Sequence, residues 1–278
     1  MGENSSPPLH GKRAGQLGAN RLTSGLPTTH EGERHGDLTT TTPSPLPFTT
    51  YLFGITVDLV VKRTSVTSGT IHVSQCQKPT GWLGRFVLWN MNSRHSKVTD
   101  WGLSKISIRK PDIILDVGCG GGRTVSKLAA VAAEGKVYGV DYSTASVAVA
   151  KKTNTQWIAV GRVEIRKGSV SQLPFADEMF DLVTAVETHF WWPDLPTDMR
   201  EVLRVLRPGG TLLIIAEIYK GAKTKTAKLA EKYLPLSGMK LLNVDEHRDL
   251  FANTGYSDVQ IIEEPGKGWI CGTGRKPA

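Results

Sequence analysis

Two acidic residues and a run of glycines form the part of this sequence that could bind a charged nucleoside. Asp116 lies near the end of an apolar segment that leads into Gly118-Cys119-Gly120-Gly121-Gly122, and Asp141 closes the next apolar segment. Glycine adopts positive φ without a steric penalty and lets the backbone approach a ligand closely. A carboxylate such as that of Asp141 can accept hydrogen bonds from both hydroxyls of a ribose. The spacing therefore predicts a nucleoside site around this glycine loop.

The acid beside the glycine loop bears on which nucleoside would fit. The loop reads Asp116-x-Gly118-x-Gly120-x-Gly122, which differs from the G-x-G-x-x-G/A of dinucleotide sites. A negative charge at Asp116 would repel a pyrophosphate and would favour a ligand that carries an ammonium or sulfonium group. An oxidoreductase of the NAD type stays open as an alternative. Tyr219 and Lys223 have the Y-x-x-x-K spacing, but they fall at a strand exit where helical alignment is not expected.

Short apolar segments alternate with helical ones, and these elements must position the two acids. Strands that alternate with helices indicate a mostly parallel sheet covered on both faces. We therefore expect a three-layer α/β/α, doubly wound fold with a seven-stranded sheet. Ser143 is placed to cap a helix, and Pro208-Gly209-Gly210 predicts a turn. The expected strands are 113–117, 136–140, 163–166, 180–186, 211–218, 259–263 and 269–273, and the expected helices start near 123 or span 144–155, 198–206, 223–233 and 244–254.

The first 79 residues differ in composition from the rest of the chain. They are rich in Ser, Pro, Thr, Gly and His, and their apolar segments are too few to build a core. We expect residues 1–79 to be a disordered or loosely attached extension, with a short hairpin within 46–73. The domain itself is expected over residues 80–278, and it opens with one or two helices over 80–108.

Charge, cysteine usage and hydropathy exclude several classes of protein. The net charge is +8, but the basic residues are scattered apart from a group between Lys220 and Lys232 that is typical of a solvated helix face. Cys76, Cys119 and Cys271 are far apart, which indicates neither a disulfide framework nor a metal site and favours the reducing cytoplasm. No run reaches the roughly 18 apolar residues of a membrane span. The chain also lacks an aromatic and basic platform for RNA, so no nucleic-acid partner is expected.

Four motifs, in order, resemble those of the class I S-adenosylmethionine-dependent methyltransferases, and in particular their small-molecule, ubiquinone-biosynthesis-like branch. The resemblance extends from about residue 81 to the C-terminus. It implies the Rossmann-like methyltransferase fold and S-adenosylmethionine as the cofactor. The motifs are LDVGCGGG (Leu115–Gly122), VYGVDYS (Val137–Ser143), GSVSQLPFADEMFDLVTAVET (Gly168–Thr188) and RVLRPGGTLLI (Arg204–Ile214).

The resemblance also implies which residues bind the cofactor. Asp141 would hold the ribose, with Tyr142 against the adenine. Ser169 would lie at the adenine edge, where the commoner pattern has an Asp or Asn, so this contact is expected to be weaker or to pass to the backbone. Asp116 and the glycine loop would surround the methionine end. The full expected set is Asp116, Gly118, Cys119, Gly120, Asp141, Tyr142, Ser169, Val170 and Glu187.

Methyl transfer is an in-line displacement at a sulfonium, so alignment and desolvation are the main tasks of the protein. A base is needed only when the acceptor must lose a proton, and Glu187 and His189 are the catalytic candidates. Trp191 and Trp192 would rim the acceptor pocket. The helix around Met91, Asn92 and His95 is expected to close over the site as a lid.

We therefore expect methyl transfer to a small-molecule acceptor. Two alternatives stay open besides the NAD-type oxidoreductase: a non-catalytic S-adenosylmethionine-binding protein and an RNA-associated relative, to which the net charge gives some weight. The identity of the acceptor and the oligomeric state do not follow from the sequence.

Overall fold

The computed structural model describes residues 48–52, 55–59, 95–233 and 239–278. Strands β1 (Phe48–Leu52) and β2 (Ile55–Leu59) pair antiparallel, as expected of a hairpin within residues 46–73. Met91 and Asn92, expected in the lid, lie outside the described residues, as does the remainder of the N-terminal extension. No helix in the described part is long and apolar enough to cross a membrane.

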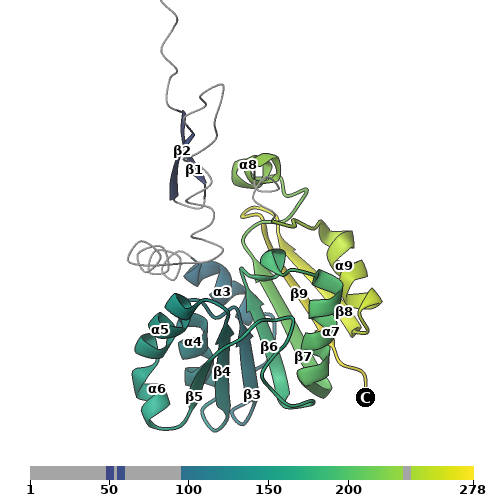
Figure 1. The fold of residues 1–278 in the computed structure, drawn as a ribbon. Helices are drawn as coiled ribbons and strands as arrows, with labels where there is room; N and C mark the ends of the chain where they lie inside the picture. Colours follow the sequence, from purple (N-terminus) through teal and green to yellow (C-terminus); the bar gives the residue numbers. More distant parts are fainter. Residues whose placement is uncertain (1–47, 53–54, 60–94, 234–238) are drawn as a thin grey trace, which may run out of the picture. The chain divides into compact units, whose positions relative to one another are not determined.

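A seven-stranded sheet organises the domain (Figure 1), as the alternating pattern predicts. Its order is β5-β4-β3-β6-β7-β9-β8, in which the first five strands run parallel and β9 is antiparallel to both of its neighbours. The chain leaves the central β3 in one direction and returns on its other side through β6. Ligands bind at such a switch point, beyond the carboxyl ends of the strands. The strands are β3 (Ile113–Val117), β4 (Lys136–Asp141), β5 (Val163–Lys167), β6 (Phe180–Val186), β7 (Leu206–Ala216), β8 (Ser257–Glu264) and β9 (Trp269–Arg275).

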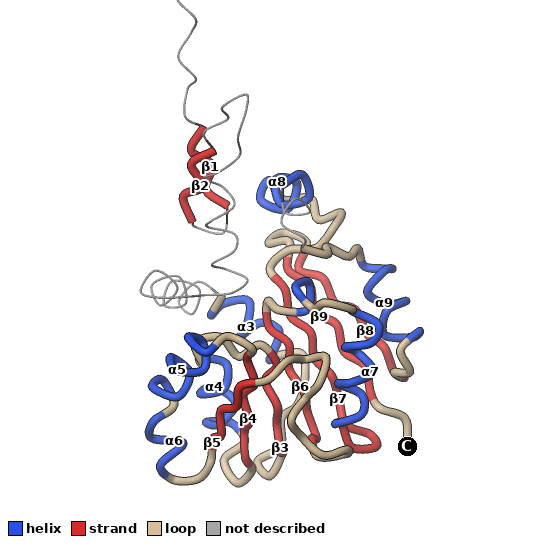
Figure 2. The backbone as a smooth tube through the Cα atoms, in the orientation of Figure 1, coloured by secondary structure: helices blue, strands red, loops and turns tan. Residues whose placement is uncertain are grey.

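Helices cover both faces of the sheet (Figure 2), because consecutive residues of each central strand are buried on opposite sides. Leu115 belongs to the core formed with α7 and α9, whereas its neighbour Ile114 belongs to the core formed with α3, α4 and α5. The three-layer α/β/α prediction is confirmed. The helices are α3 (Ser96–Leu103), α4 (Arg123–Val131), α5 (Thr144–Thr153), α6 (Thr155–Ala159), α7 (Leu195–Val205), α8 (Lys225–Tyr233) and α9 (Val244–Asn253), with a 3-10 turn η1 (His189–Trp191).

Two element boundaries differ from the sequence predictions by three residues or more. Helix α7 begins three residues early, because Asp194 caps it by accepting a hydrogen bond from the Thr197 amide and Pro196 is tolerated in the first turn. Strand β7 begins at Leu206, so Pro208-Gly209-Gly210 lies inside it as an irregularity instead of ending an element. The C-terminus explains this, because the Gly209 amide donates to the carbonyl of Lys276 and the Lys276 amide donates to that of Gly210.

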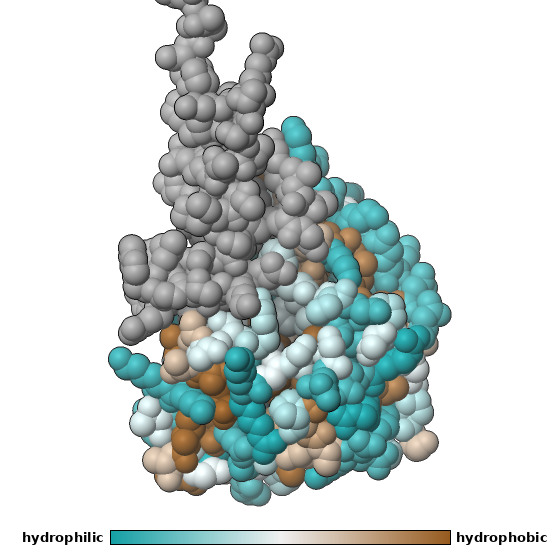
Figure 3. Space-filling model, viewed as in Figure 1, coloured by the Kyte–Doolittle hydropathy of each residue, from teal (hydrophilic) through white to brown (hydrophobic). Residues whose placement is uncertain are grey.

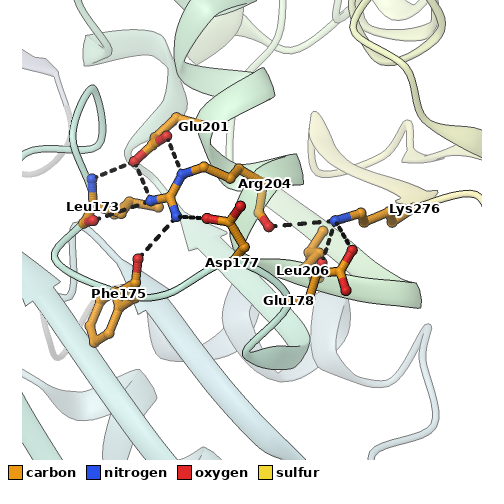
Figure 4. Close-up of polar contacts among 8 residues, drawn as sticks. All are labelled: Leu173, Phe175, Asp177, Glu178, Glu201, Arg204, Leu206 and Lys276. Atoms are coloured by element: carbon orange, nitrogen blue, oxygen red, sulfur yellow. Dashed lines mark hydrogen bonds and ion pairs between the residues drawn. The ribbon is translucent and has the colours of Figure 1, made fainter.

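The segment that links β5 to β6 is clamped onto α7 by Arg204 (Figure 4). Its guanidinium donates to the Glu201 carboxylate, to Asp177 and to the backbone carbonyls of Leu173 and Phe175. The Glu201 carboxylate in turn accepts from the Leu173 amide at 2.7 Å. The clamp fixes a loop whose first residues, Ser169 and Val170, reach the site described below.

Hydrophilic residues cover much of the face shown in Figure 3, and hydrophobic residues are visible on it in separate groups. Among the described residues, four large hydrophobic side chains are exposed: Val131, Tyr142, Ile158 and Val160. Only Tyr142 of these four lines the cavity at the switch point. An aromatic ring exposed at a cavity is available for contact with a ligand.

Candidate active site

A cavity of about 370 Å³ lies beyond the carboxyl ends of β3, β4 and β6. Its wall is formed by the glycine loop, the start of α3, the first turns of α4 and the segment that follows β6. All nine residues expected to bind the cofactor line it, although they come from three separate motifs. They are Asp116, Gly118, Cys119, Gly120, Asp141, Tyr142, Ser169, Val170 and Glu187.

The glycine loop needs its glycines for packing as well as for ligand approach. Gly118 and Gly122 have φ of +70° and +77°, a region that side-chain-bearing residues rarely adopt. A Cβ at Gly118 would lie 2.8 Å from the side chain of Thr188, and one at Gly122 would lie 2.8 Å from the Ala150 backbone. The loop is thus pressed against both the β6 exit and α5, and its position is set by the fold.

Asp141 links the second strand to the glycine loop. One carboxylate oxygen accepts from the Gly120 amide at 2.9 Å, and the other accepts from the Ser143 amide at 2.8 Å. Burial raises the pKa of Asp141, and these two hydrogen bonds oppose that rise. A carboxylate offers about four acceptor sites. Asp141 can therefore hold the loop and still accept hydrogen bonds from a ligand.

Asp116 lies deeper, with 2 % of its surface exposed. It is opposite Thr184 in the register of β3 and β6, and the Thr184 hydroxyl donates to its carboxylate at 2.7 Å. Burial raises the pKa of Asp116 to about 7, against the effect of the Thr184 hydrogen bond and with a further contribution from Asp141. Burial also raises the pKa of Cys119 well above its usual value, so this thiol stays protonated and is not a nucleophile.

Glu187 lies at the exit of β6 in a left-handed backbone conformation, with φ of +58°. One of its carboxylate oxygens accepts from the Glu217 amide, and the other lies 3.7 Å from Nδ1 of His95. His95 precedes α3 and also lines the cavity. Donor atoms of His95, Glu187 and Glu217 lie within 4.8 Å of one another, an arrangement that could hold a cation. The sequence marked His95 as a lid residue, but it carried no signal that Glu217 would lie beside it.

His189 is the expected catalytic residue that the structure does not bring to the site. Its ring is 2 % exposed, does not line the cavity and faces His247, with the two Nε2 atoms 3.2 Å apart. Burial and the neighbouring His247 lower its pKa well below the usual value. The structure therefore places the His189 ring in the interior, apart from the cavity that Glu187, the other candidate base, does line. The left-handed turn at Glu187 and the following 3-10 turn direct the ring into the interior.

The two tryptophans expected at the acceptor side both line the cavity. Trp191 is half-buried, whereas Trp192 is 5 % exposed and donates through Nε1 to the Thr188 hydroxyl at 3.0 Å. Thr188 is also the side chain against which Gly118 packs. The tryptophan wall and the glycine loop are therefore held in register by one threonine.

Fold and site together define a class: a doubly wound α/β protein with a cavity at the switch point of its sheet. A methyltransferase-domain family matches residues 115–214. A demethylmenaquinone methyltransferase of Geobacillus kaustophilus is 30 % identical over 189 residues, which are 60 % of this chain and 80 % of that protein. An O-methyltransferase of Penicillium expansum is 26 % identical over 72 % of this chain and 70 % of that protein.

The solved structures agree on the fold. A SAM-dependent methyltransferase from Aquifex aeolicus superposes with a TM-score of 0.57, over 69 % of this chain and 97 % of that one, at 17 % identity. The chain belongs to the class I S-adenosylmethionine-dependent methyltransferases. It is therefore an enzyme that uses S-adenosylmethionine, and the NAD-type alternative is not favoured.

Proposed function

We propose that the protein methylates a small-molecule acceptor bound beside Trp191 and Trp192, with S-adenosylmethionine held by the glycine loop and the two acids. S-adenosylmethionine, when bound, supplies an activated methyl group on a sulfonium. The observation that carries the proposal is that Asp116 and Asp141 lie in one cavity on either side of the glycine loop. Negative charge at these two positions suits a cofactor with a ribose, an ammonium and a sulfonium.

We propose these roles for the individual residues. Asp141 accepts hydrogen bonds from the ribose, and Tyr142 and Val170 contact the adenine faces. The backbone of Gly118, Cys119 and Gly120, with Asp116 behind it, contacts the methionine end. Ser169 offers a hydroxyl to the adenine edge. The residues present fit the cofactor chemically, because the cavity combines two carboxylates, backbone amides and apolar or aromatic faces.

Two facts support a small molecule as the acceptor. The relatives include proteins named for O-methylation and for demethylmenaquinone methylation. The cavity is enclosed on the acceptor side by Trp191, Trp192 and Pro193, which suit a flat apolar compound. We also propose a reducing compartment such as the cytoplasm, since Cys119 and Cys271 are free and buried.

Calorimetry with S-adenosylmethionine and with NAD tests the cofactor assignment, and Asp141→Ala tests its geometry. We expect the wild-type protein to bind S-adenosylmethionine and not NAD. Asp141→Ala should weaken binding by about 1.5–3 kcal/mol, the scale of a hydrogen bond to a charged group. The exposed Asp249 gives the matched control, and Asp249→Ala should leave affinity unchanged. If Asp141→Ala bound S-adenosylmethionine with unchanged affinity, the assignment of Asp141 to the ribose would be refuted.

A labelled-methyl screen across phenols, amines, thiols, arsenite and quinone-like compounds tests the acceptor class. Transfer to at least one of these small molecules is expected. Label that appears only in added RNA or protein would contradict the proposal.

A further inference from the structure

We propose that Thr188 is a positioning residue for methyl transfer, because it holds Trp191 and Trp192 in a fixed place relative to the glycine loop. This inference rests on the proposed function and deepens it, since it names the residue that aligns the acceptor with the cofactor. Thr188 lies two residues beyond the end of β6, is half-buried and lines the cavity itself.

Both tryptophans of the cavity wall are hydrogen-bonded to Thr188. Nε1 of Trp192 donates to the Thr188 hydroxyl at 3.0 Å, and the Trp191 amide donates to the Thr188 carbonyl at 2.9 Å. The indole N–H is the only hydrogen-bonding group of a tryptophan side chain. Because Thr188 engages that group, Trp192 presents carbon atoms to the cavity, which suits an acceptor with an apolar face.

The same threonine is attached to the strand that carries the glycine loop. Its hydroxyl donates at 3.3 Å to the carbonyl of Val117, the last residue of β3. Its side chain lies against Gly118, where an added Cβ would come within 2.8 Å of it. A hydroxyl has one proton to donate and lone pairs to accept, so its bonds to Val117 and from Trp192 fix its direction. A chain of hydrogen bonds therefore runs from the tryptophan wall to the start of the loop.

This attachment matters because methyl transfer is sensitive to distance. Reacting atoms must lie about 3–3.5 Å apart and in line, and a misplacement of about 1 Å can lower the rate by about 10²-fold. The glycine loop follows β3 whereas the tryptophans follow β6, so their spacing depends on contacts between the two strand ends. Thr188 makes such contacts on both sides. Its loss should therefore lower kcat more than it lowers cofactor affinity.

Nitrogen NMR of the full chain labelled with 15N-tryptophan tests the hydrogen bond without an acceptor. The indole signal of Trp192 is identified by its loss in Trp192→Phe. We expect this N–H to exchange slowly with water in the wild-type protein, because it is buried and hydrogen-bonded. Thr188→Val is similar in shape but lacks the hydroxyl, and it should speed the exchange by about tenfold, the equivalent of one hydrogen bond. An unchanged exchange rate in Thr188→Val overturns the proposal.

Kinetics and calorimetry provide the second readout. With a phenol acceptor found in the labelled-methyl screen, Thr188→Val should lower kcat by about 10–10²-fold. Its affinity for S-adenosylhomocysteine should stay within about threefold, because an interaction that only aligns the reacting atoms affects kcat and not ground-state binding. Thr188→Ser keeps the hydroxyl and should retain kcat within about threefold. A kcat in Thr188→Ser as low as that of Thr188→Val would contradict a role for the hydroxyl.

Thr254→Val is the matched control for a loss of stability alone. The Thr254 hydroxyl is buried and donates to the carbonyls of Leu250 and Phe251, and Thr254 does not line the cavity. Its substitution should lower Tm but leave kcat and the Trp192 signal unchanged. An equal fall in kcat in Thr254→Val would show that lost stability explains the effect, and the proposal would be wrong.

Trp192→Phe breaks the same hydrogen bond from the other side, and it replaces Thr188→Val as the test if that variant does not fold. The same fall in kcat is expected, and an unchanged kcat would overturn the proposal. A wild-type protein that neither binds S-adenosylmethionine nor methylates any compound of the screen would refute the proposed function. A wild-type protein that does both, with an equal kcat in Thr188→Val, would refute this inference alone.

Discussion

At the scale of single residues, Asp116 shows a conflict between stability and binding. A carboxyl group buried at the end of a central strand loses hydration, and one hydroxyl from Thr184 only partly compensates for that loss. The same buried negative charge is what a sulfonium and an ammonium would be attracted to. A residue that costs the apo protein stability and serves a ligand is typical of functional sites.

Asp116→Asn should therefore stabilise the apo protein and weaken cofactor binding. The pKa of Asp116 is raised to about 7 in the folded protein from 3.8. The folded state thus holds this proton more tightly, so the contribution of Asp116 to stability is greatest below pH 4 and falls as pH rises toward 7. At 1.36 kcal/mol for each pKa unit, the gain from Asp116→Asn at pH 8 is on the order of 4 kcal/mol at most.

Thermal unfolding at pH 4 and pH 8 checks this prediction. The difference in Tm between Asp116→Asn and wild type should be small at pH 4 and largest at pH 8. In the wild-type protein, affinity for S-adenosylmethionine should increase through pH 7 as Asp116 ionises. Equal differences in Tm at the two pH values would contradict a buried, titrating carboxyl group.

At the scale of elements, a lysine on α4 forms polar contacts with α3. Lys127 on α4 bonds to Ser96 and forms an ion pair with Asp100, both on α3. We expect Lys127→Ala to lower stability by about 1 kcal/mol and to speed amide hydrogen exchange in residues 96–103. The cause is that α3 then loses these polar contacts and keeps its apolar contacts with the sheet, which include those of Val98, Trp101 and Gly102. Hydrogen exchange by mass spectrometry measures this, and Lys151→Ala on the exposed face of α5 is the control.

The Arg204 clamp shown in Figure 4 makes a second prediction at this scale. Lys in place of Arg keeps the charge but cannot form the forked contacts to Glu201, Asp177 and two carbonyls. Arg204→Lys should lower the free energy of unfolding by about 1–3 kcal/mol and reduce cofactor affinity through Ser169 and Val170. Guanidinium unfolding and calorimetry measure the two effects. Arg248→Lys, which alters an exposed ion pair with Asp245, should change neither.

Features of the fold and site that depend on nearby residues could be predicted from the sequence, whereas those that depend on distant contacts could not. The glycine loop, the acids at the ends of β3 and β4, and the cap at Ser143 depend on neighbours in the chain, and they were predicted. The ring direction of His189 and the early start of β7 were not, because they depend on contacts with His247 and Lys276 far along the chain. The proximity of His95 to Glu187 likewise arises only when α3 packs on the sheet. Local patterns thus predicted the part of the cavity wall around the glycine loop, while long-range packing decides the part around His95 and Glu187.

At the scale of the whole molecule, the two ends of the sheet have different tasks. The parallel strands β3, β4 and β6 present the cavity at their carboxyl ends. The antiparallel strands β9 and β8 extend the sheet beyond β7, and β9 backs the wall against which α3 packs, as in the contact between Trp101 and Trp269. Among the residues that the structure describes, those that line the cavity lie between 95 and 193. The domain should therefore bind its cofactor without the N-terminal extension.

A chain that begins at Thr80 should bind S-adenosylhomocysteine within about twofold of the full chain, since it retains all of the described residues that line the cavity. A chain that begins at Ile106 is the matched control. It lacks α3, which buries Val98 and packs Gly102 so closely that a Cβ there would lie 2.4 Å from Ile215. It should therefore lose both stability and affinity. Calorimetry and thermal unfolding of the three chains make the comparison. Lost binding in a chain from Thr80 that still unfolds cooperatively would show that residues 1–79 help to form the site.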